Sequence, residues 1–246
     1  MPNVDHALSE SYAGAARVVA RVLQGESLAV ALVAAGRRTL DGAVQDLSFA
    51  CLRDYGVGDA LLARLLHQPA NDVLVRALLL VALRELAAGH AADYTAVSQA
   101  VAAAETLGLA RAKGLVNAVL RSYLRDRAAL DAAVAATEIG RYRHPQWWID
   151  RLRRDQPEAW ARVLESGNAR PPMTLRVNAR RTTLAAYAER LAAAGIGAAR
   201  IGPTALRLDR PRPVGELPGF AAGEVSVQDE GAQRAAALLA PGRGQR

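Results

Sequence analysis

The stretch DVLVRALLLVALRELAAG, residues 72–89, decides the fold of the first half of this chain. Apolar side chains occupy nearly every position, and Arg76, Arg84 and Glu85 are the main interruptions. A helix that is apolar almost all round has no face suited to water and belongs at the centre of a bundle. The run is also too short to span a bilayer. We therefore expect a buried central helix with other helices packed around it.

Helical patterns continue on both sides of this stretch. Apolar residues recur three and four positions apart in SYAGAARVVARVL (11–23) and again in AKGLVNAVLRSYLRDR (112–127). Short connections marked by glycine favour neighbouring helices packed against one another. Residues 1–140 are therefore predicted to form an all-α domain of about six or seven helices.

The pattern changes from Arg141 onward. Two short helices are expected to begin at Pro145 and Pro157, because a proline at a first helical position loses no hydrogen bond. The best domain boundary predicted from the sequence therefore lies near residue 140, with residues 141–246 forming the second part.

Strand patterns appear only in this second part. RPPMTLRVN (170–178) alternates apolar and polar residues, as a half-buried strand does. TLAAYAERLAAAG (183–195) reads as an amphipathic helix, and ALRLD (205–209) and EVSVQ (224–228) are short strand candidates. We therefore expect a small α+β fold after the helical domain.

The positive charge is concentrated in this second part. The chain of 246 residues has a net charge of +7. Residues 1–140 hold 13 basic and 14 acidic side chains, whereas residues 141–246 hold 18 basic and 10 acidic ones. An excess of this kind attracts polyanions such as nucleic acid, although it also suits a merely solvated surface.

Two groups of polar residues are candidates for contact with RNA. The first lies on and around the predicted strand 170–178, where guanidinium and amide groups suit phosphate, 2′-hydroxyl and base-edge contacts. The second lies on the last helix of the first domain, where it is equally consistent with the polar face of a bundle helix. The candidate residues are Arg170, Arg176, Asn178, Arg180 and Arg181 in the first group, and Lys113, Arg121 and Arg125 in the second.

The tryptophans allow two interpretations. Trp147, Trp148 and Trp160 lie on the two short helices after residue 140. They could stack on nucleic-acid bases, or they could pack the junction between the two parts of the chain. The second interpretation is the one favoured by the apolar residues around them.

Several chemistries are not expected. The four histidines are scattered without metal-ligand spacing, so no metal site is predicted. The one cysteine, Cys51, lies in an apolar helical pattern and is expected to be a buried, inert thiol. The first ten residues have neither a basic nor an apolar leader segment, so we expect a cytoplasmic protein without a membrane anchor.

Five sequence strings, taken in order, resemble a known family. They are KGLVNAVLR (113–121), RYRHPQWWIDRLRR (141–154), RPPMTLRVN (170–178), LPGFAAGEVSVQDEGAQ (217–233) and LLAP (238–241). They resemble the N-terminal part of the RsmB (Sun/Fmu) family of 16S ribosomal RNA cytosine-C5 methyltransferases. The resemblance covers essentially the whole chain.

The resemblance implies an all-α NusB-like helical bundle followed by a small α+β RNA-recognition subdomain. In the family, a Rossmann-like core then binds S-adenosylmethionine and carries two catalytic cysteine motifs. Neither the cofactor loop nor those motifs occur in this sequence, so the core is expected to be absent from the chain. No catalytic or cofactor-binding residue can be assigned, and Cys51 matches neither catalytic cysteine.

The sequence thus predicts the rRNA-binding portion of a methyltransferase, inactive by itself, whose partner is 16S ribosomal RNA. The helical domain is nearly neutral, which favours a protein partner or a second copy as its contact. An alternative is a self-standing NusB-type RNA-binding factor in antitermination or ribosome assembly. Another is a helical protein-interaction module whose arginines serve solubility alone.

The last predicted helix is expected to lack a partner. If the segment 225–241 leads into a cofactor-binding sheet, the apolar side of its helix would be exposed in this chain. That side consists of Ala232, Ala235, Ala236, Leu238 and Leu239.

Overall fold

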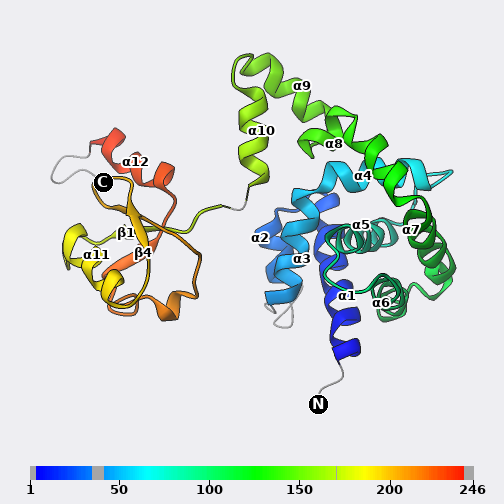
Figure 1. Cartoon of the computed structure of the whole chain (residues 1–246), viewed down its shortest axis with the longest axis horizontal. Helices are drawn as coiled ribbons and strands as arrows, with labels where there is room; N and C mark the ends of the chain where they lie inside the picture. Colours follow the sequence, from blue (N-terminus) through cyan, green and yellow to red (C-terminus); the bar gives the residue numbers. More distant parts are fainter. Residues whose placement is uncertain (1–3, 35–41, 170, 241–246) are drawn as a thin grey trace. The chain divides into compact units, whose positions relative to one another are not determined.

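The computed structural model describes residues 4–34, 42–169 and 171–240, apart from the side chains of residues 4–7. The chain divides into two compact units, Met1–Ala169 and Arg170–Arg246. We call them the helical unit and the small unit. Figure 1 shows the elements of each.

The described part of the helical unit consists of α-helices joined by short connections. They are α1 (Val4–Leu23), α2 (Leu28–Ala34), α3 (Gly42–Arg53), α4 (Tyr55–Leu65), α5 (Val73–Ala88), α6 (Asp93–Thr106), α7 (Lys113–Ala135), α8 (Glu138–Tyr142), α9 (Gln146–Asp155) and α10 (Trp160–Asn168). One turn of 3-10 helix, Ala110–Ala112, leads into α7.

Helix α5 lies at the centre of the bundle, as its sequence predicts. Asp72 caps its first turn by accepting hydrogen bonds from the backbone N–H groups of Leu74 and Val75, at 2.8 and 3.3 Å. Gly89 ends it in the left-handed conformation, with φ of 67°. Between these residues, ten side chains of α5 are buried, and α1, α3, α4, α6 and α7 pack around the helix.

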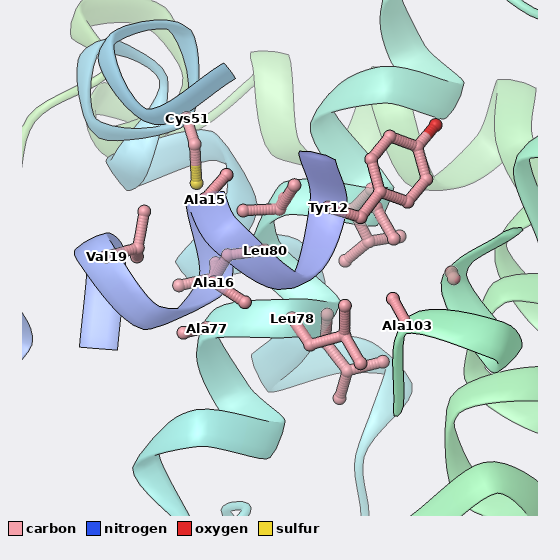
Figure 2. Packing of buried hydrophobic residues seen from close by; sticks show 14 of the residues in the cluster. Tyr12, Ala15, Ala16, Val19, Cys51, Ala77, Leu78, Leu80 and Ala103 are labelled. Atoms are coloured by element: carbon pink, nitrogen blue, oxygen red, sulfur yellow. The ribbon is translucent and has the colours of Figure 1, made fainter. Parts of the chain in front are cut away.

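The core of the bundle is built mostly from small and branched apolar side chains. Figure 2 shows Leu78 and Leu80 of α5 close to Ala16 of α1, with Tyr12 and Ala103 among the same buried cluster. Alanines at the helix contacts let the helix backbones approach closely, whereas the leucines fill the space between them.

Cys51 of α3 is part of this core, and its side chain is buried. Burial raises the pKa of its thiol to about 12, although the nearby guanidinium of Arg84 opposes the shift. The thiolate is the reactive form of cysteine, so this residue is a structural one. The predicted buried thiol is confirmed.

Helices α8, α9 and α10 cluster with the helical unit. The N–H of Gly56 in α4 donates to the carbonyl of Arg143, just after α8, at 3.1 Å. A β-carbon at Gly56 would lie 2.6 Å from the carbonyl carbon of Arg143, so the two backbones can approach only because Gly56 has no side chain. The guanidinium of Arg143 also pairs with Asp54 at 2.8 Å. These contacts explain why the two units divide after Ala169, whereas the sequence pattern changes near residue 140.

The two short helices of this region differ in how well the prolines mark them. Helix α9 begins directly after Pro145. Helix α10 begins at Trp160 rather than at Pro157, because residues 157–159 form a turn that ends with the N–H of Trp160 donating to the carbonyl of Gln156 at 2.8 Å.

The small unit is a four-stranded antiparallel sheet with helices. Its described elements are β1 (Thr174–Val177), α11 (Leu184–Ala193), β2 (Ala198–Arg200), β3 (Ala205–Leu208), a 3-10 turn (Val214–Glu216), β4 (Val225–Val227) and α12 (Glu230–Leu239). The strand order is β2-β3-β1-β4. Every neighbouring pair is antiparallel, and the predicted α+β fold is confirmed.

One face of this sheet packs against α11. Leu175 and Val177 of β1 form a core with Tyr187 and Leu191 of α11 and with Leu206 of β3. Because side chains alternate across a strand, residues between these positions point to the other face. That alternation places Arg176 on the face opposite α11.

Helix α12 carries no buried side chain among its residues. Leu238 and Leu239 are 84% and 78% exposed, and the predicted unpartnered apolar side is therefore present. Gln233 joins the helix to the sheet, because its side-chain amide donates to the carbonyl of Gln228 at 3.1 Å and its oxygen accepts from the hydroxyl of Thr204 at 3.1 Å.

Candidate nucleic-acid interface

Strand β1 presents one arginine from a largely buried strand. Arg176 is exposed, whereas its neighbours Leu175 and Val177 are buried. The register with β4 places Ser226 directly opposite Arg176, and the guanidinium donates to the side-chain oxygen of Gln228 at 3.2 Å. Hydroxyl, amide and guanidinium groups thus share this face of the sheet.

Asn178, directly after β1, already makes hydrogen bonds within the protein through its backbone and its side chain. Its N–H donates to the carbonyl of Glu224 at 2.8 Å, and its side-chain amide donates to the carbonyl of Gly223 at 2.9 Å. Its side-chain oxygen accepts from the N–H of Arg180 at 3.1 Å. Asn178 therefore fixes the turn after β1 against the segment that precedes β4.

Arg180 and Arg181 have different surroundings although they are neighbours. The guanidinium of Arg181 donates to the carbonyl of Ala222 at 2.7 Å. The guanidinium of Arg180 has no hydrogen-bond or ion-pair partner among the described residues, and the side chain is exposed. The N–H donors of the Arg180 guanidinium are thus available for a ligand.

These residues surround a concavity of about 470 Å³. We call it the strand groove. It lies between the ends of β1 and β4 and the turn after β1, and its lining residues are Arg176, Val177, Asn178, Ala179, Arg180, Thr204, Gly223, Val225 and Ser226. Three of the predicted candidates, Arg176, Asn178 and Arg180, therefore line one concavity. Arg170 lies outside the described residues.

A second set of contacts holds residues 218–224, which include the groove residue Gly223, against α11. Arg190 of α11 forms an ion pair with Glu224, and the hydroxyl of Tyr187 donates to the carbonyl of Pro218 at 2.8 Å. Burial and the nearby Glu224 carboxylate raise the pKa of Tyr187, so this hydroxyl stays a donor. Glu224, Ser226 and Gln228 were not predicted from the sequence, because the pairing of β4 with β1 that brings them to the groove leaves no local pattern.

The candidates on α7 have partners of their own in the helical unit. Lys113 pairs with Glu105 at 2.9 Å. Arg121 donates to the side chain of Asn117 at 3.0 Å, and Arg125 contacts Asp126 at 3.2 Å. The three are exposed or half-exposed, but local acidic and amide groups already satisfy part of their hydrogen-bonding capacity. Their contact with RNA stays a prediction.

Metal-ion sites and membrane-spanning helices are both absent from the described residues. Within them, no group of histidine, cysteine, aspartate and glutamate is arranged to hold a metal ion. No helix of the described ranges is long and apolar enough to cross a membrane.

Comparisons with known families match both units. Residues 15–125 match the NusB family. Residues 144–215 match the RsmF/B-like methyltransferase ferredoxin-like domain. The second match begins before α9, so it includes helices that pack in the helical unit. The match to two successive domains favours the RsmB-type interpretation over a NusB-type factor alone.

Curated relatives match over most of this chain. Ribosomal RNA small subunit methyltransferase B of Vibrio cholerae is 38% identical over 90% of this chain and 52% of its own length. The protein of the same name in Pseudomonas putida is 40% identical over 94% of this chain and 55% of its own length. That of Xylella fastidiosa is 40% identical over 92% of this chain and 54% of its own length. The chain thus spans about half the length of the curated relatives it matches.

A solved structure, described as the crystal structure of PH0851, has the same fold. It superposes with a TM-score of 0.67 at 16% identity, over 96% of this chain and 56% of that one. The fold therefore defines a NusB-like bundle followed by an RsmF/B-type ferredoxin-like domain. Together with the relatives, these two domain matches support an RsmB-type N-terminal region.

Proposed function

We propose that this chain is the rRNA-binding N-terminal region of a 16S rRNA (cytosine-C5) methyltransferase that uses S-adenosylmethionine. The names of the relatives support ribosomal RNA as the substrate and methyl transfer as the reaction. The cytosine-C5 chemistry rests on the resemblance of the five sequence strings. A ribosomal RNA substrate also supports the cytoplasm as the place of action.

The strand groove is the observation that carries RNA binding. Among the described residues, the guanidinium of Arg180 has no protein partner, and that of Arg176 contacts only the neutral side chain of Gln228. Guanidinium groups in this state attract phosphate, because no protein carboxylate neutralises them. Ser226 and Asn178 add hydroxyl and amide groups to the same concavity. Such groups suit contact with 2′-hydroxyls, which distinguish RNA from DNA.

The candidates divide into two roles in this proposal. Arg176 and Arg180 contact phosphate directly. Asn178 and Arg181 hold the turn and the 222–224 backbone in position, with their remaining donors facing RNA. Arg170, Lys113, Arg121 and Arg125 are proposed as additional contacts outside the groove.

The helical unit is proposed to contact a protein partner or a second copy of the chain. Its near-neutral charge supports this role over strong RNA binding, and Leu115 on α7 is 42% exposed. Light scattering after size exclusion tests self-association. A monomer at all concentrations would leave only a different protein as the partner.

Catalysis is proposed to need residues beyond those present here. None of the 246 residues matches the family's cofactor loop or catalytic cysteines, so we assign no group to hold S-adenosylmethionine. Calorimetric titration of the chain with S-adenosylmethionine is expected to show no binding. A micromolar affinity, or methyl transfer to rRNA by this chain alone, would overturn this part of the proposal.

RNA binding is tested with labelled transcripts that tile 16S rRNA, measured by fluorescence anisotropy at several salt concentrations. The Arg176→Ala/Arg180→Ala variant is expected to bind at least tenfold more weakly. The slope of its log K against log salt should also be shallower. The expected change is about 0.7 for each phosphate of single-stranded RNA that the variant no longer neutralises. Arg212→Ala/Arg234→Ala is the matched control, because these two exposed arginines pair with Glu216 and Glu230 outside the groove.

Equal reductions of affinity in the Arg176→Ala/Arg180→Ala variant and the control would mean that only net charge matters. Unchanged affinity in the Arg176→Ala/Arg180→Ala variant would remove the strand groove from RNA binding.

A further inference from the structure

We infer that the helical unit carries a second RNA-binding surface, which stacks a base of single-stranded RNA on Trp147 of α9. The surface consists of Trp147, Arg151 and Arg154, and we call it the Trp147 stripe. These residues are four and three positions apart, so they follow one line along the helix. They span about 10 Å of the helix, at 1.5 Å per residue. The inference rests on RNA as the partner, but it uses no residue of the strand groove.

The tryptophans of this region have contrasting environments. Trp160 is half-buried, in an edge contact with Tyr142 at 4.9 Å between ring centroids, and the guanidinium of Arg153 lies over its ring at 4.4 Å. Trp147 is 69% exposed and contacts Trp148 edge-on, at 5.7 Å between centroids. Within the described ranges, no cation lies over Trp147. Trp160 therefore has a structural role, whereas Trp147 has ring surface available.

The fold fixes the direction in which the Trp147 stripe points. Ile149 and Leu152 of α9 are buried in a small cluster with Leu164 of α10. At 100° per residue, Trp147, Arg151 and Arg154 lie on the side of α9 opposite Ile149. Gln146 additionally donates to Glu138 of α8 at 3.2 Å. Helix α9 is thus fixed in place on its buried side. RNA binding at the stripe therefore loses no further entropy by ordering the helix.

The two arginines of the stripe are held together by one carboxylate. Arg151 contacts Asp155 at 2.7 Å, and Arg154 contacts the other oxygen of the same carboxylate at 3.5 Å. Their side chains remain 61% and 71% exposed. A guanidinium has five N–H donors, so most of those on each arginine are free for phosphate.

This combination of groups fits a single strand better than an apolar protein surface. An exposed aromatic ring beside guanidinium groups offers stacking for a base and hydrogen bonds for the adjacent phosphates. Stacking tolerates any base, because each base has a π face. We therefore assign the stripe to an unpaired stretch of RNA, read without strong sequence preference.

The test uses the full chain and a labelled, unstructured RNA of about 20 nucleotides, which is long enough to cover a site of the size typical for single strands. Trp147→Ala is expected to bind this RNA about five-fold or more weakly, in the range seen when one stacking interaction is removed. Trp147→Phe keeps an aromatic ring and should restore most of the affinity. Tyr94→Ala is the matched control, because Tyr94 is a 76% exposed aromatic residue on α6.

Iodide quenching of tryptophan fluorescence gives an independent readout. In the free chain, Trp147→Phe should remove the fraction most accessible to iodide, and RNA should protect that fraction in the unsubstituted chain. An unchanged affinity in Trp147→Ala would overturn the stripe while leaving the strand groove intact. If iodide cannot reach Trp147 in the free chain, protein covers the ring and the inference is wrong. If the unsubstituted chain binds no RNA, the proposed function and this inference both fail.

Discussion

The helical unit and the small unit differ in how many of their arginines are paired with a carboxylate. In the helical unit, carboxylates hold many of them: Arg84 and Arg143 share Asp54, at 2.6 and 2.8 Å, and Arg127 pairs with Asp93 at 2.9 Å. In the described part of the small unit, Arg180, Arg200, Arg207 and Arg210 have no such partner. Net charge therefore locates a polyanion surface only coarsely, because carboxylate partners neutralise part of it.

The two units also differ in the extent of their own hydrophobic cores. The core of the helical unit extends over several helices around α5. The core of the small unit consists of α11 and one face of a short sheet. We therefore expect substitutions in the bundle to have the larger effect on stability, and substitutions in the small unit to act mainly on binding.

The largest effect is expected from Leu78→Ala in α5. Leu78 is completely buried, and removing such a side chain typically costs about 2–5 kcal/mol. Hydrogen exchange should show faster opening across α5 and unchanged protection of β1 and β3. Val33→Ala, at an 80% exposed position on α2, is the control and should have little effect. An equal drop in protection in the small unit would show that the two units unfold together.

A smaller effect is expected from Gly56→Ala in α4. The added β-carbon would approach the backbone of Arg143 and His144 to less than 3 Å, so α8 must move away. Overpacking of this kind costs about 1–3 kcal/mol. Gly114→Ala in α7 is the matched control, because its β-carbon would meet no atom within 4 Å. Chemical denaturation of both variants checks this. An unchanged free energy of unfolding in Gly56→Ala would mean that α8 to α10 are not anchored through this contact.

Alkaline pH should weaken the helical unit through Cys51. Its pKa is about 12 in the folded chain and near its ordinary value of 9 in the unfolded chain. The stabilising contribution is therefore complete below about pH 9 and is lost as the pH rises toward 12. Between about pH 8 and 10.5 the free energy of unfolding should fall by roughly 1–2 kcal/mol from this group. Urea titrations of the unsubstituted chain and Cys51→Ala test this, and a drop of equal size in both would exclude the thiol as its source.

The smallest stability effect is expected within the small unit, from Arg181→Ala. Removing its hydrogen bond to the Ala222 carbonyl should cost about 0.5–1.5 kcal/mol. Arg180→Ala removes no such bond and should stay within about 0.5 kcal/mol of the unsubstituted chain. RNA affinity should show the reverse order, with Arg180→Ala the weaker binder. Thermal unfolding and RNA-binding anisotropy, measured on the same samples, test whether Arg180 contacts RNA directly and Arg181 positions the backbone.

The sequence predicted those elements whose own residues carry a strong pattern. Helix α5 was predictable because nearly all of its side chains are apolar, and β1 because buried and exposed residues alternate around Arg176. β2 could not be predicted, because Ala198-Ala199-Arg200 lacks such a pattern and forms a strand only by pairing with β3.

The candidate site was predictable only in part, for the same reason. Arg176, Asn178 and Arg180 were identified from one short stretch of sequence. Their roles depend on partners far along the chain, such as Gly223 for Asn178 and Gln228 for Arg176. The division after Ala169 likewise depends on the approach of Gly56 to Arg143, which leaves no sign in either local sequence.

Photo-cross-linking of the full chain to 16S rRNA transcripts, with the linked peptides mapped by mass spectrometry, tests the central claim most directly. We predict cross-links at residues 176–180 and 225–226 of the strand groove, and their disappearance in the Arg176→Ala/Arg180→Ala variant. Cross-links confined to α7, or groove cross-links retained undiminished in that variant, would contradict the claim that the strand groove binds RNA.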